Sequence, residues 1–239
     1  MASKFRLLTL AVVAIFPSPI ACFLLRHLFG YKIGKRVRIG FSIVDAKECS
    51  IDDDVSIGHL NIFMGTKRVS IGDHSRIGHL NVFHGGDLVS IGRYCEILRL
   101  NEINSLSPSE IINPVDQTFS IGDGTMIAAS HKIDFTDRVE LGKRVILGGR
   151  NSSLWTHNRQ TSKPIKIGDC SYIGSEIRIA PGGEIPANCI VGIGSVISGK
   201  IEGELQLIVG VPARPAKALT TSDRFLIENK TRSDLPDDI

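Results

Sequence analysis

The chain has 239 residues, of which 42% are apolar and 22% are charged, so it is long enough to bury a core and falls in the globular range. Its formal net charge is only +3, and no run of basic residues carries interleaved aromatic residues, which argues against a nucleic-acid partner. The five cysteines are odd in number and lack C-x-x-C spacing, which favours a reduced, cytoplasmic compartment over a disulfide framework.

Residues 1–30 form an apolar N-terminal segment. Residues 7–25 are almost wholly apolar, but Pro17 and Pro19 interrupt them, so the pattern does not predict a clean membrane-spanning helix. The basic residues that follow suit an anionic membrane surface: Arg26, Lys32, Lys35, Arg36 and Arg38. Three alternatives stay open at this point: peripheral attachment at the inner face of the membrane, a packed helix that caps the domain, and a true span.

A six-residue repeat runs through residues 31–217. Each hexad has an aliphatic residue at its first position, usually glycine at the second, and a small or apolar residue at the fifth, as in Ile71, Gly72 and Ser75. This pattern predicts short strands joined by tight corners, with the first and fifth residues facing inward and glycine permitting backbone angles that other residues resist. Three such sides close one coil of a triangular prism, and stacked coils bury one continuous core.

The coils differ in length, and the extra residues share one place. The predicted coil starts are Ile33, Ile51, Ile71, Ile91, Ile121, Leu141, Ile167 and Ile185. The predicted third-side residues of the long coils are Phe63, Phe83, Ile103, Ile133 and Ser153, and every insertion follows one of them. We therefore expect the two large insertions, 104–120 and 154–166, to lie on the same edge of the prism, which in solenoids is often the working face.

Polar residues fill the position two residues before each third-side residue, in the order Asn61, Asn81, Asn101, His131 and Asn151. Stacked asparagine side chains can hydrogen-bond along such a column. The pattern favours a structural role for His131, and a role beside a site, helped by Asp134, stays open.

His157 stands apart from the other histidines because it lies in an insertion, after Trp155 and before a polar run. A neutral imidazole is the usual group for taking a proton from a hydroxyl or amine that attacks an acyl group near neutral pH. The spacing alone also fits an ordinary surface histidine. His59, His74, His79 and His84 are predicted to be surface residues at corners and short turns.

The segments 149-GRNSSLWTH-157, 192-GIGSVI-197 and 210-GVPARP-215 resemble those of the hexapeptide-repeat acyltransferases, and the first of them is similar to the histidine-bearing turn of bacterial sugar and surface-polysaccharide O-acetyltransferases. The resemblance covers about residues 30–217. It implies an all-β fold, a left-handed parallel β-helix, with a short apolar N-terminal helix before residue 31 and a polar C-terminal tail over residues 218–239. The handedness comes from the resemblance, because the usual crossover rule is right-handed.

The resemblance also implies a chemistry. Acetyl-CoA would lie in a groove between subunits of a homotrimer, and His157 would be the general base toward a sugar or glycan acceptor, with no metal required. Cofactor-binding candidates carried over on matching positions are Gly194, Ser195, Lys200, Pro212, Ala213 and Arg214. Substrate-binding candidates on the other side of the base are Trp155, Asn151, His131 and Asp134. The apolar N-terminus would suit a lipid-linked acceptor, whose sugar the sequence does not identify.

Two rival interpretations remain open. The γ-class carbonic anhydrases resemble the same fold, and His131 and His157 each lie ten residues before a coil start, but a convincing third histidine for a zinc site is not found in the sequence. A non-catalytic β-helix scaffold would bind no coenzyme A. The sequence also leaves open O- against N-acetylation and the length of the acyl chain.

Overall fold

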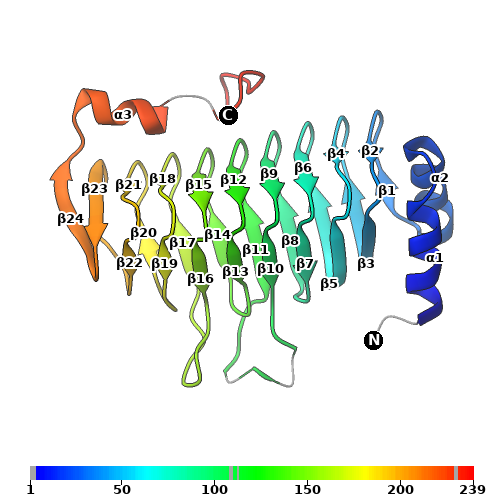
Figure 1. The fold of residues 1–239 in the computed structure, drawn as a ribbon, viewed down its shortest axis with the longest axis horizontal. Coiled ribbons are helices and arrows are strands. Elements are labelled where there is room, and N and C mark those ends of the chain that lie inside the picture. The colour runs from blue at the N-terminus through cyan, green and yellow to red at the C-terminus, as the bar shows by residue number, and fades with distance from the viewer. Residues whose placement is uncertain (1–3, 108–109, 112, 229–230) are drawn as a thin grey trace.

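The computed structural model describes residues 4–107, 110–111, 113–228 and 231–239, and its strands wind into a left-handed parallel β-helix of about nine turns. Strands of successive coils pair in parallel, so each inner coil hydrogen-bonds to the coil before it and the coil after it. Figure 1 shows the coils in sequence along the long axis, with two helices over the first coil and a third helix at the opposite end.

The strands form three faces. The first face contains β1 (Lys32–Ile33), the ends of β3 (Ile43–Ile51) and β5 (Ile62–Ile71), β8 (Leu88–Ile91), β11 (Thr118–Ile121), β14 (Val139–Leu141), β17 (Ile165–Ile167) and β20 (Glu184–Ile185). The second contains β2 (Arg38–Ile39), β4 (Ser56–Ile57), β6 (Arg76–His79), β9 (Glu96–Arg99), β12 (Met126–Ala129), β15 (Ile146–Arg150), β18 (Tyr172–Ile173), β21 (Ile190–Val191), β23 (Gln206–Gly210) and the antiparallel β24 (Ala213–Ala218). The third contains the starts of β3 and β5, β7 (Val82–His84), β10 (Glu102–Asn104), β13 (Lys132–Asp134), β16 (Ser153–Trp155), β19 (Arg178–Ile179) and β22 (Val196–Ile197).

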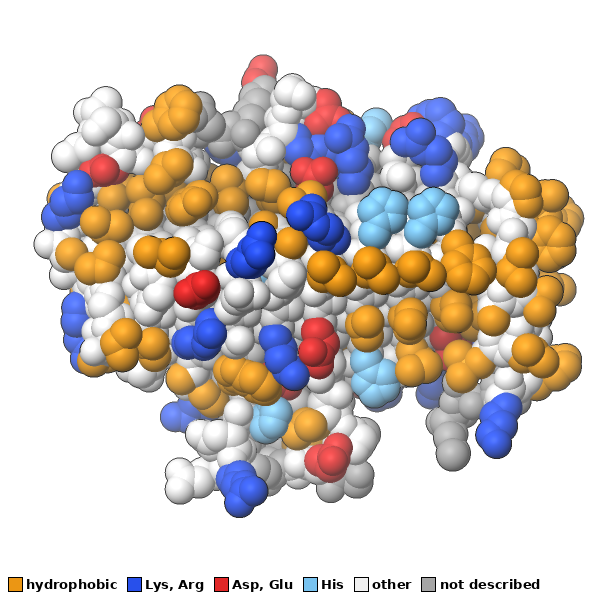
Figure 2. All heavy atoms as spheres, in the orientation of Figure 1, with side chains coloured by type: hydrophobic (Ala, Val, Ile, Leu, Met, Phe, Trp, Pro, Cys, Tyr) orange, Lys and Arg blue, Asp and Glu red, His pale blue; other side chains and the backbone are white. Residues whose placement is uncertain are grey.

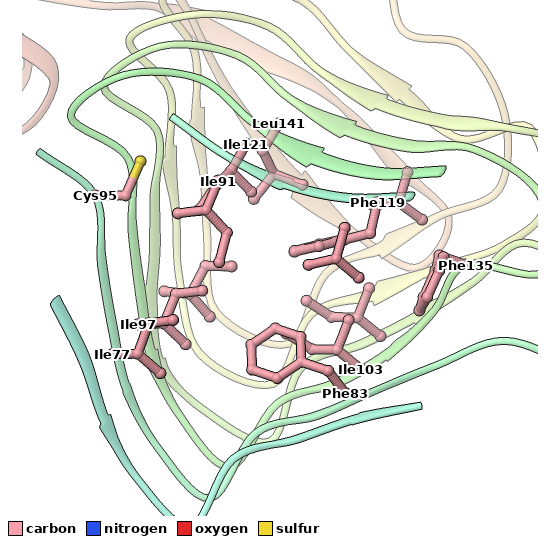
Figure 3. Packing of buried hydrophobic residues seen from close by; sticks show 14 of the residues in the cluster. Ile77, Phe83, Ile91, Cys95, Ile97, Ile103, Phe119, Ile121, Phe135 and Leu141 are labelled. Atoms are coloured by element: carbon pink, nitrogen blue, oxygen red, sulfur yellow. The ribbon is translucent and has the colours of Figure 1, made fainter. Parts of the chain in front are cut away.

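The aliphatic column predicted from the hexads is confirmed. Strand pairing places all eight predicted coil starts in one register, from Ile33 to Ile185. On the third face the Phe63 and Phe83 rings stack with centroids 4.2 Å apart. Ile103 continues the column beyond Phe83 (Figure 3). These three side chains are fully buried, and burial of each is worth about 2 kcal/mol.

The second-position glycines serve a purpose different from the one expected. Gly72 and Gly122 do not adopt the left-handed region; that conformation falls two residues later, at His74 and Gly124. A Cβ on Gly72 would lie 2.8 Å from the carbonyl carbon of Gly92 in the next coil. Glycine is therefore needed because the backbones of neighbouring coils approach closely there, and the expected backbone-angle explanation is wrong.

The register prediction also fails by one residue in the coil that carries His157. Gly148 and Gly149 add a residue between β12 and β15, where the pairing shifts from Ile127 opposite Leu147 to Ala129 opposite Arg150. The inward residues there are Ser152 and Leu154, both fully buried. Asn151 is exposed instead of continuing the polar column.

Both ends of the solenoid are covered. The N-terminal segment forms two helices where one was expected, α1 (Lys4–Ala14) and α2 (Ser18–Phe29), and both contact the first coil. The C-terminal tail includes the helix α3 (Thr221–Glu228) and then returns over earlier coils, where Arg232 donates a 2.7 Å hydrogen bond to the His74 carbonyl. Among the described residues, no helix is long and apolar enough to cross a membrane.

Candidate active site

The two large insertions follow β10 and β16 on the third face and extend from the same edge of the prism, as predicted (Figure 1). The second insertion is a short hairpin: His157 and Ser162 form an antiparallel bridge, and the Lys163 amide donates a 2.8 Å hydrogen bond to the Thr156 carbonyl. His157 therefore sits at the base of a hairpin, directly beyond the end of a strand in the rigid wall.

Asp134, at the end of β13, organises the site. Its Oδ2 lies 2.8 Å from His157 Nδ1 and also accepts hydrogen bonds from the Thr156 amide at 2.9 Å and the Thr156 hydroxyl at 2.7 Å. Its Oδ1 accepts hydrogen bonds from the amide and the hydroxyl of Thr136. The Asp134 side chain is 3% exposed and the His157 side chain 23%, so the carboxylate is enclosed while the imidazole reaches the surface.

The register of the strands explains why these residues meet. Asp134 pairs with Trp155, the last residue of the adjacent strand β16, which places the two residues that follow that strand, Thr156 and His157, beside the carboxylate. A carboxylate on Nδ1 fixes the orientation of the ring and favours the tautomer with its proton on Nδ1. The Nε2 atom is then left as the basic nitrogen of the ring.

The first insertion is tied to the same group of residues. The Leu106 amide donates a hydrogen bond to the Thr136 hydroxyl, and farther along the Ser162 amide donates one of 2.7 Å to Asn113 Oδ1. The Asp137 amide donates to the Thr156 hydroxyl. Both insertions are therefore positioned against one hydrogen-bond network that centres on Asp134.

Charged and aromatic groups surround His157. Hydrogen bonds from Ser107 hold the pKa of Glu110 below its usual range, with a smaller contribution from the nearby His157. The Trp155 ring meets the His157 ring edge to face, at a centroid distance of 6.5 Å, and Lys132 Nζ lies 5.3 Å from the Trp155 centroid. A partly exposed aromatic ring and an acidic group thus lie near the imidazole, and a basic group lies near the indole.

His131 belongs to the wall, as the polar column predicted. Its amide donates to Asn101 Oδ1 at 3.0 Å, and its Nδ1 accepts a hydrogen bond from the Ser152 amide. Asn81 and Asn101 continue the ladder below it, with a 3.0 Å hydrogen bond from the Asn101 side-chain amide to Asn81 Oδ1. Burial lowers the pKa of His131 from 6.5 to about 4, with a small opposing effect from the Leu147 carbonyl, so the ring is neutral near pH 7.

This burial makes a prediction for acid stability. Because the folded-state pKa is below the ordinary value, the unfolded chain takes up the proton more readily, and the contribution of His131 is complete above about pH 6.5 and is lost as the pH falls toward 4. We expect the loss to be roughly 3 kcal/mol in the free energy of unfolding. His131→Asn, which continues the asparagine ladder, should match the wild type near pH 7 and lack this part of the acid loss.

Urea unfolding at several pH values between about 7 and 4 measures the free energy of unfolding of each protein. The difference between His131→Asn and the wild type removes the effect of the titrating groups that both proteins share. His59→Asn, at an exposed histidine, should show the same change in the free energy of unfolding with pH as the wild type. If His131→Asn also showed the wild-type change with pH, His131 would not be buried in its neutral form.

The cofactor-side candidates lie farther along the solenoid. Lys200 follows β22, which is two strands beyond β16 on the same face, so Lys200 and His157 share one edge. Lys200, Ala213 and Arg214 line one hollow of about 450 Å³, and the exposed Lys200 ammonium pairs with Glu202 at 3.0 Å. The structure thus gathers three of the six candidates at one place.

The other three candidates differ in accessibility. Ser195 is fully buried in the wall, where its hydroxyl donates to the Gly192 carbonyl and accepts from the Gly210 amide, so its side chain is not open to a ligand. Gly194 has a φ of 72°, and a Cβ added to it would meet no atom of the described residues within 4 Å, which leaves its backbone open. Pro212 follows a cis peptide bond in the turn before β24.

Two threonines that the sequence did not single out complete the site: Thr136 and Thr156 are fully buried, and each donates twice to Asp134. Asn113 and Glu110 were also missed, inside the first insertion. The sequence did contain one sign of this arrangement, the run Asp134-x-Thr136, in which Asp134 ends a strand of the third face and Thr136 follows it.

Among the residues that the structure describes, no group of three or more His, Cys, Asp or Glu side chains is placed to hold a metal ion.

Comparisons with known proteins place this geometry in context. No protein-family model matches the chain. Over 109 residues it is 30% identical to a galactoside O-acetyltransferase of Escherichia coli (strain K12), a match that covers 46% of this chain and 48% of that protein. The chain resembles the hexapeptide-repeat sugar O-acetyltransferases. The match spans about half the length of that curated relative.

Solved structures with the same kind of fold are more distant in sequence. A UDP-N-acetylglucosamine acyltransferase from Campylobacter jejuni is 21% identical, with a TM-score of 0.49 over 79% of this chain and 71% of that one. A polysialic acid O-acetyltransferase is 15% identical, with a TM-score of 0.41 over 79% and 88%. A hexapeptide-repeat acetyltransferase from Vibrio cholerae, complexed with acetyl coenzyme A, is 18% identical, with a TM-score of 0.41 over 92% and 91%.

Proposed function

We propose that this protein transfers an acetyl group from acetyl-CoA to a hydroxyl group of a sugar or glycan in surface polysaccharide biosynthesis. The observation that carries the proposal is the His157–Asp134 pair, in which a buried carboxylate holds a half-buried imidazole at the edge where both insertions meet. The partial match to a galactoside O-acetyltransferase supports the acyl group and the kind of acceptor.

The chemistry follows from the tautomer that Asp134 favours. His157 Nε2 takes the proton of the acceptor hydroxyl as its oxygen attacks the thioester carbonyl of acetyl-CoA. The tetrahedral intermediate collapses with cleavage of the carbon–sulfur bond, and the leaving thiolate takes the proton back from His157. Asp134 stabilises the imidazolium that forms between these steps, in the manner of a catalytic triad carboxylate.

For the cofactor we propose the edge beyond His157. Lys200 and Arg214 supply positive charge for phosphates, and the open backbone at Gly194 permits a close approach of the ligand. Ser195 then contributes through its backbone. Trp155 is proposed as an apolar surface for the sugar ring, with one side of the indole near Lys132. Asn151, exposed at a corner with a φ of 60°, is kept as a candidate for an acceptor contact.

We also propose that three copies assemble, so that a neighbouring subunit completes the cofactor groove. A ladder of apolar side chains, each about half exposed, lies along the edge between the second and third faces: Phe41, Leu60, Leu80 and Leu100. The three leucines hold φ angles of 58° to 60°, an unfavourable conformation for a bulky residue. Figure 2 shows a row of hydrophobic side chains over these coils, which a second copy would cover.

The proposed compartment is the cytoplasm. All five cysteines are free thiols, and burial raises the pKa of Cys49 and Cys95 to about 12, which keeps them unreactive. This pattern suits a reducing environment.

The test is turnover of acetyl-CoA by the purified protein with a panel of simple sugars and amino sugars. We expect release of the coenzyme A thiol that depends on the acceptor, with an acetylated product visible by mass spectrometry. The amino sugars separate O- from N-acetylation, and sedimentation of the same sample gives the oligomeric state. Absence of acetyl-CoA binding would favour a scaffold, and stoichiometric zinc with hydration of carbon dioxide would favour a hydrase.

A further inference from the structure

The N-terminal helices form a hairpin that is fixed to the end of the solenoid. Leu10 and Val13 of α1 and Leu25 of α2 are buried against the first coil. Arg6 Nε donates a 2.6 Å hydrogen bond to the buried Asp45, which is part of β3. One face of the hairpin thus belongs to the folded domain, and the hairpin is held in a defined position.

The opposite face of the hairpin is apolar and exposed. On α1 and the residue after it, the exposed apolar residues recur at intervals of three and four, which places them on one stripe: Phe5, Leu8, Val12 and Ile15, at 78%, 63%, 49% and 71%. The turn and α2 add Phe16, Ile20, Phe23 and Leu28, at 43%, 46%, 54% and 58%. Figure 2 shows hydrophobic side chains gathered at the end of the molecule that α1 and α2 cover.

The sequence of the same region is basic. Residues 1–44 contain seven of the 28 basic residues of the chain and none of its 25 acidic residues. Two of the seven are paired with carboxylates, Arg6 with Asp45 and Arg36 with Asp54 of the next coil. Lys4, Lys32 and Lys35 are exposed at this end of the solenoid. An apolar face with a basic surround is complementary to the surface of an anionic bilayer, with acyl chains below phosphate headgroups.

We propose that the outer face of the α1–α2 hairpin binds the surface of an anionic lipid bilayer. Helices of 11 and 12 residues are too short to cross it, so they lie in the interface with their apolar side chains among the acyl chains. A second copy of the chain is a poorer occupant of this face, because it would bring two basic surrounds together.

This position has a consequence for the acceptor, which rests on the proposed function. The strand register places the His157 coil five steps beyond the first coil on the third face, or about 24 Å at ~4.8 Å per step. Membrane attachment through the hairpin would hold the site within reach of a glycan carried on a membrane lipid.

Co-sedimentation of the full chain with vesicles tests the membrane proposal without any need for catalysis. We expect the wild type to bind phosphatidylcholine vesicles that contain phosphatidylglycerol, and to bind pure phosphatidylcholine more weakly. Leu8→Glu/Phe23→Glu should weaken binding to both vesicle types by about 100-fold or more. Lys4→Gln/Lys32→Gln/Lys35→Gln should weaken binding to the anionic vesicles by about 100-fold and change binding to the neutral ones little.

Ile193→Glu is the matched control, because Ile193 is 73% exposed at the far end of the solenoid and its variant should bind like the wild type. Circular dichroism and thermal unfolding check that each variant folds, and the lysine variant provides a second test if the glutamate variant does not. The proposal is overturned if the wild type stays in solution with both vesicle types. It is also overturned if folded hairpin variants bind as well as the wild type, or if they lose self-association instead of lipid binding.

Discussion

His157→Ala is expected to lower kcat for acetyl transfer by about 10²–10⁴-fold, the usual contribution of a general base. The affinity for acetyl-CoA should stay near the wild-type value, since the cofactor-side residues lie two strands farther along the edge. The fold should persist as well, because His157 is partly exposed and the threonines keep their hydrogen bonds to Asp134. Steady-state kinetics and direct binding of acetyl-CoA on the same preparations separate these quantities.

His27→Ala is the control for this experiment, because His27 is an exposed histidine of α2 at the N-terminal end of the solenoid. It should retain wild-type turnover. If His157→Ala retained wild-type kcat with a proven sugar acceptor, His157 would not be the base, and another group near the hairpin would have to take the proton.

Asp134 substitutions should have effects of similar size, through positioning and through stability. Asp134→Asn preserves the shape of the side chain, but its NH₂ group cannot accept hydrogen bonds, so it favours the wrong tautomer of His157. We expect a loss of about 10²–10⁴-fold in kcat with little change in KM for acetyl-CoA. Asp134→Ala leaves four buried donors of Thr136 and Thr156 without their acceptor and should cost about 4 kcal/mol in the free energy of unfolding.

The split between kcat and KM distinguishes the two roles. Thr156→Val removes one hydroxyl from the same network while it leaves the His157–Asp134 contact in place, so it should lose stability with a smaller loss of kcat. If the loss of kcat in Asp134→Asn were no larger than in Thr156→Val, Asp134 would be a structural residue only.

Much of the fold was readable from the sequence because a hexapeptide solenoid repeats one local environment. The aliphatic residue of each hexad must face inward whatever the rest of the chain does, so the column from Ile33 to Ile185 follows from the spacing alone. The asparagine column and the place of His131 follow for the same reason. The edge that carries the insertions follows from counting residues between columns.

The failures arise where the spacing does not describe contacts between coils. Glycine at the second hexad position depends on the approach of the next coil, which is not a property of the hexad itself. The single extra residue at Gly148 and Gly149 is absorbed in a bulge at one strand pair, so the sequence count placed the third-side residue at Ser153, one position before Leu154. The turn at Pro17 separates two helices that the apolar composition did not distinguish.

The sequence by itself determined that the chain is a parallel β-helix, that two insertions share an edge, and that His157 lies in one of them, since each of these depends on periodicity along the chain. Only the tertiary structure decided which partner His157 has. Asp134 is 23 residues away, and the contact exists because β13 and β16 lie in adjacent coils with Asp134 opposite Trp155. Such a meeting depends on the register between coils and on the path of the loop, and neither is contained in the local pattern of either segment.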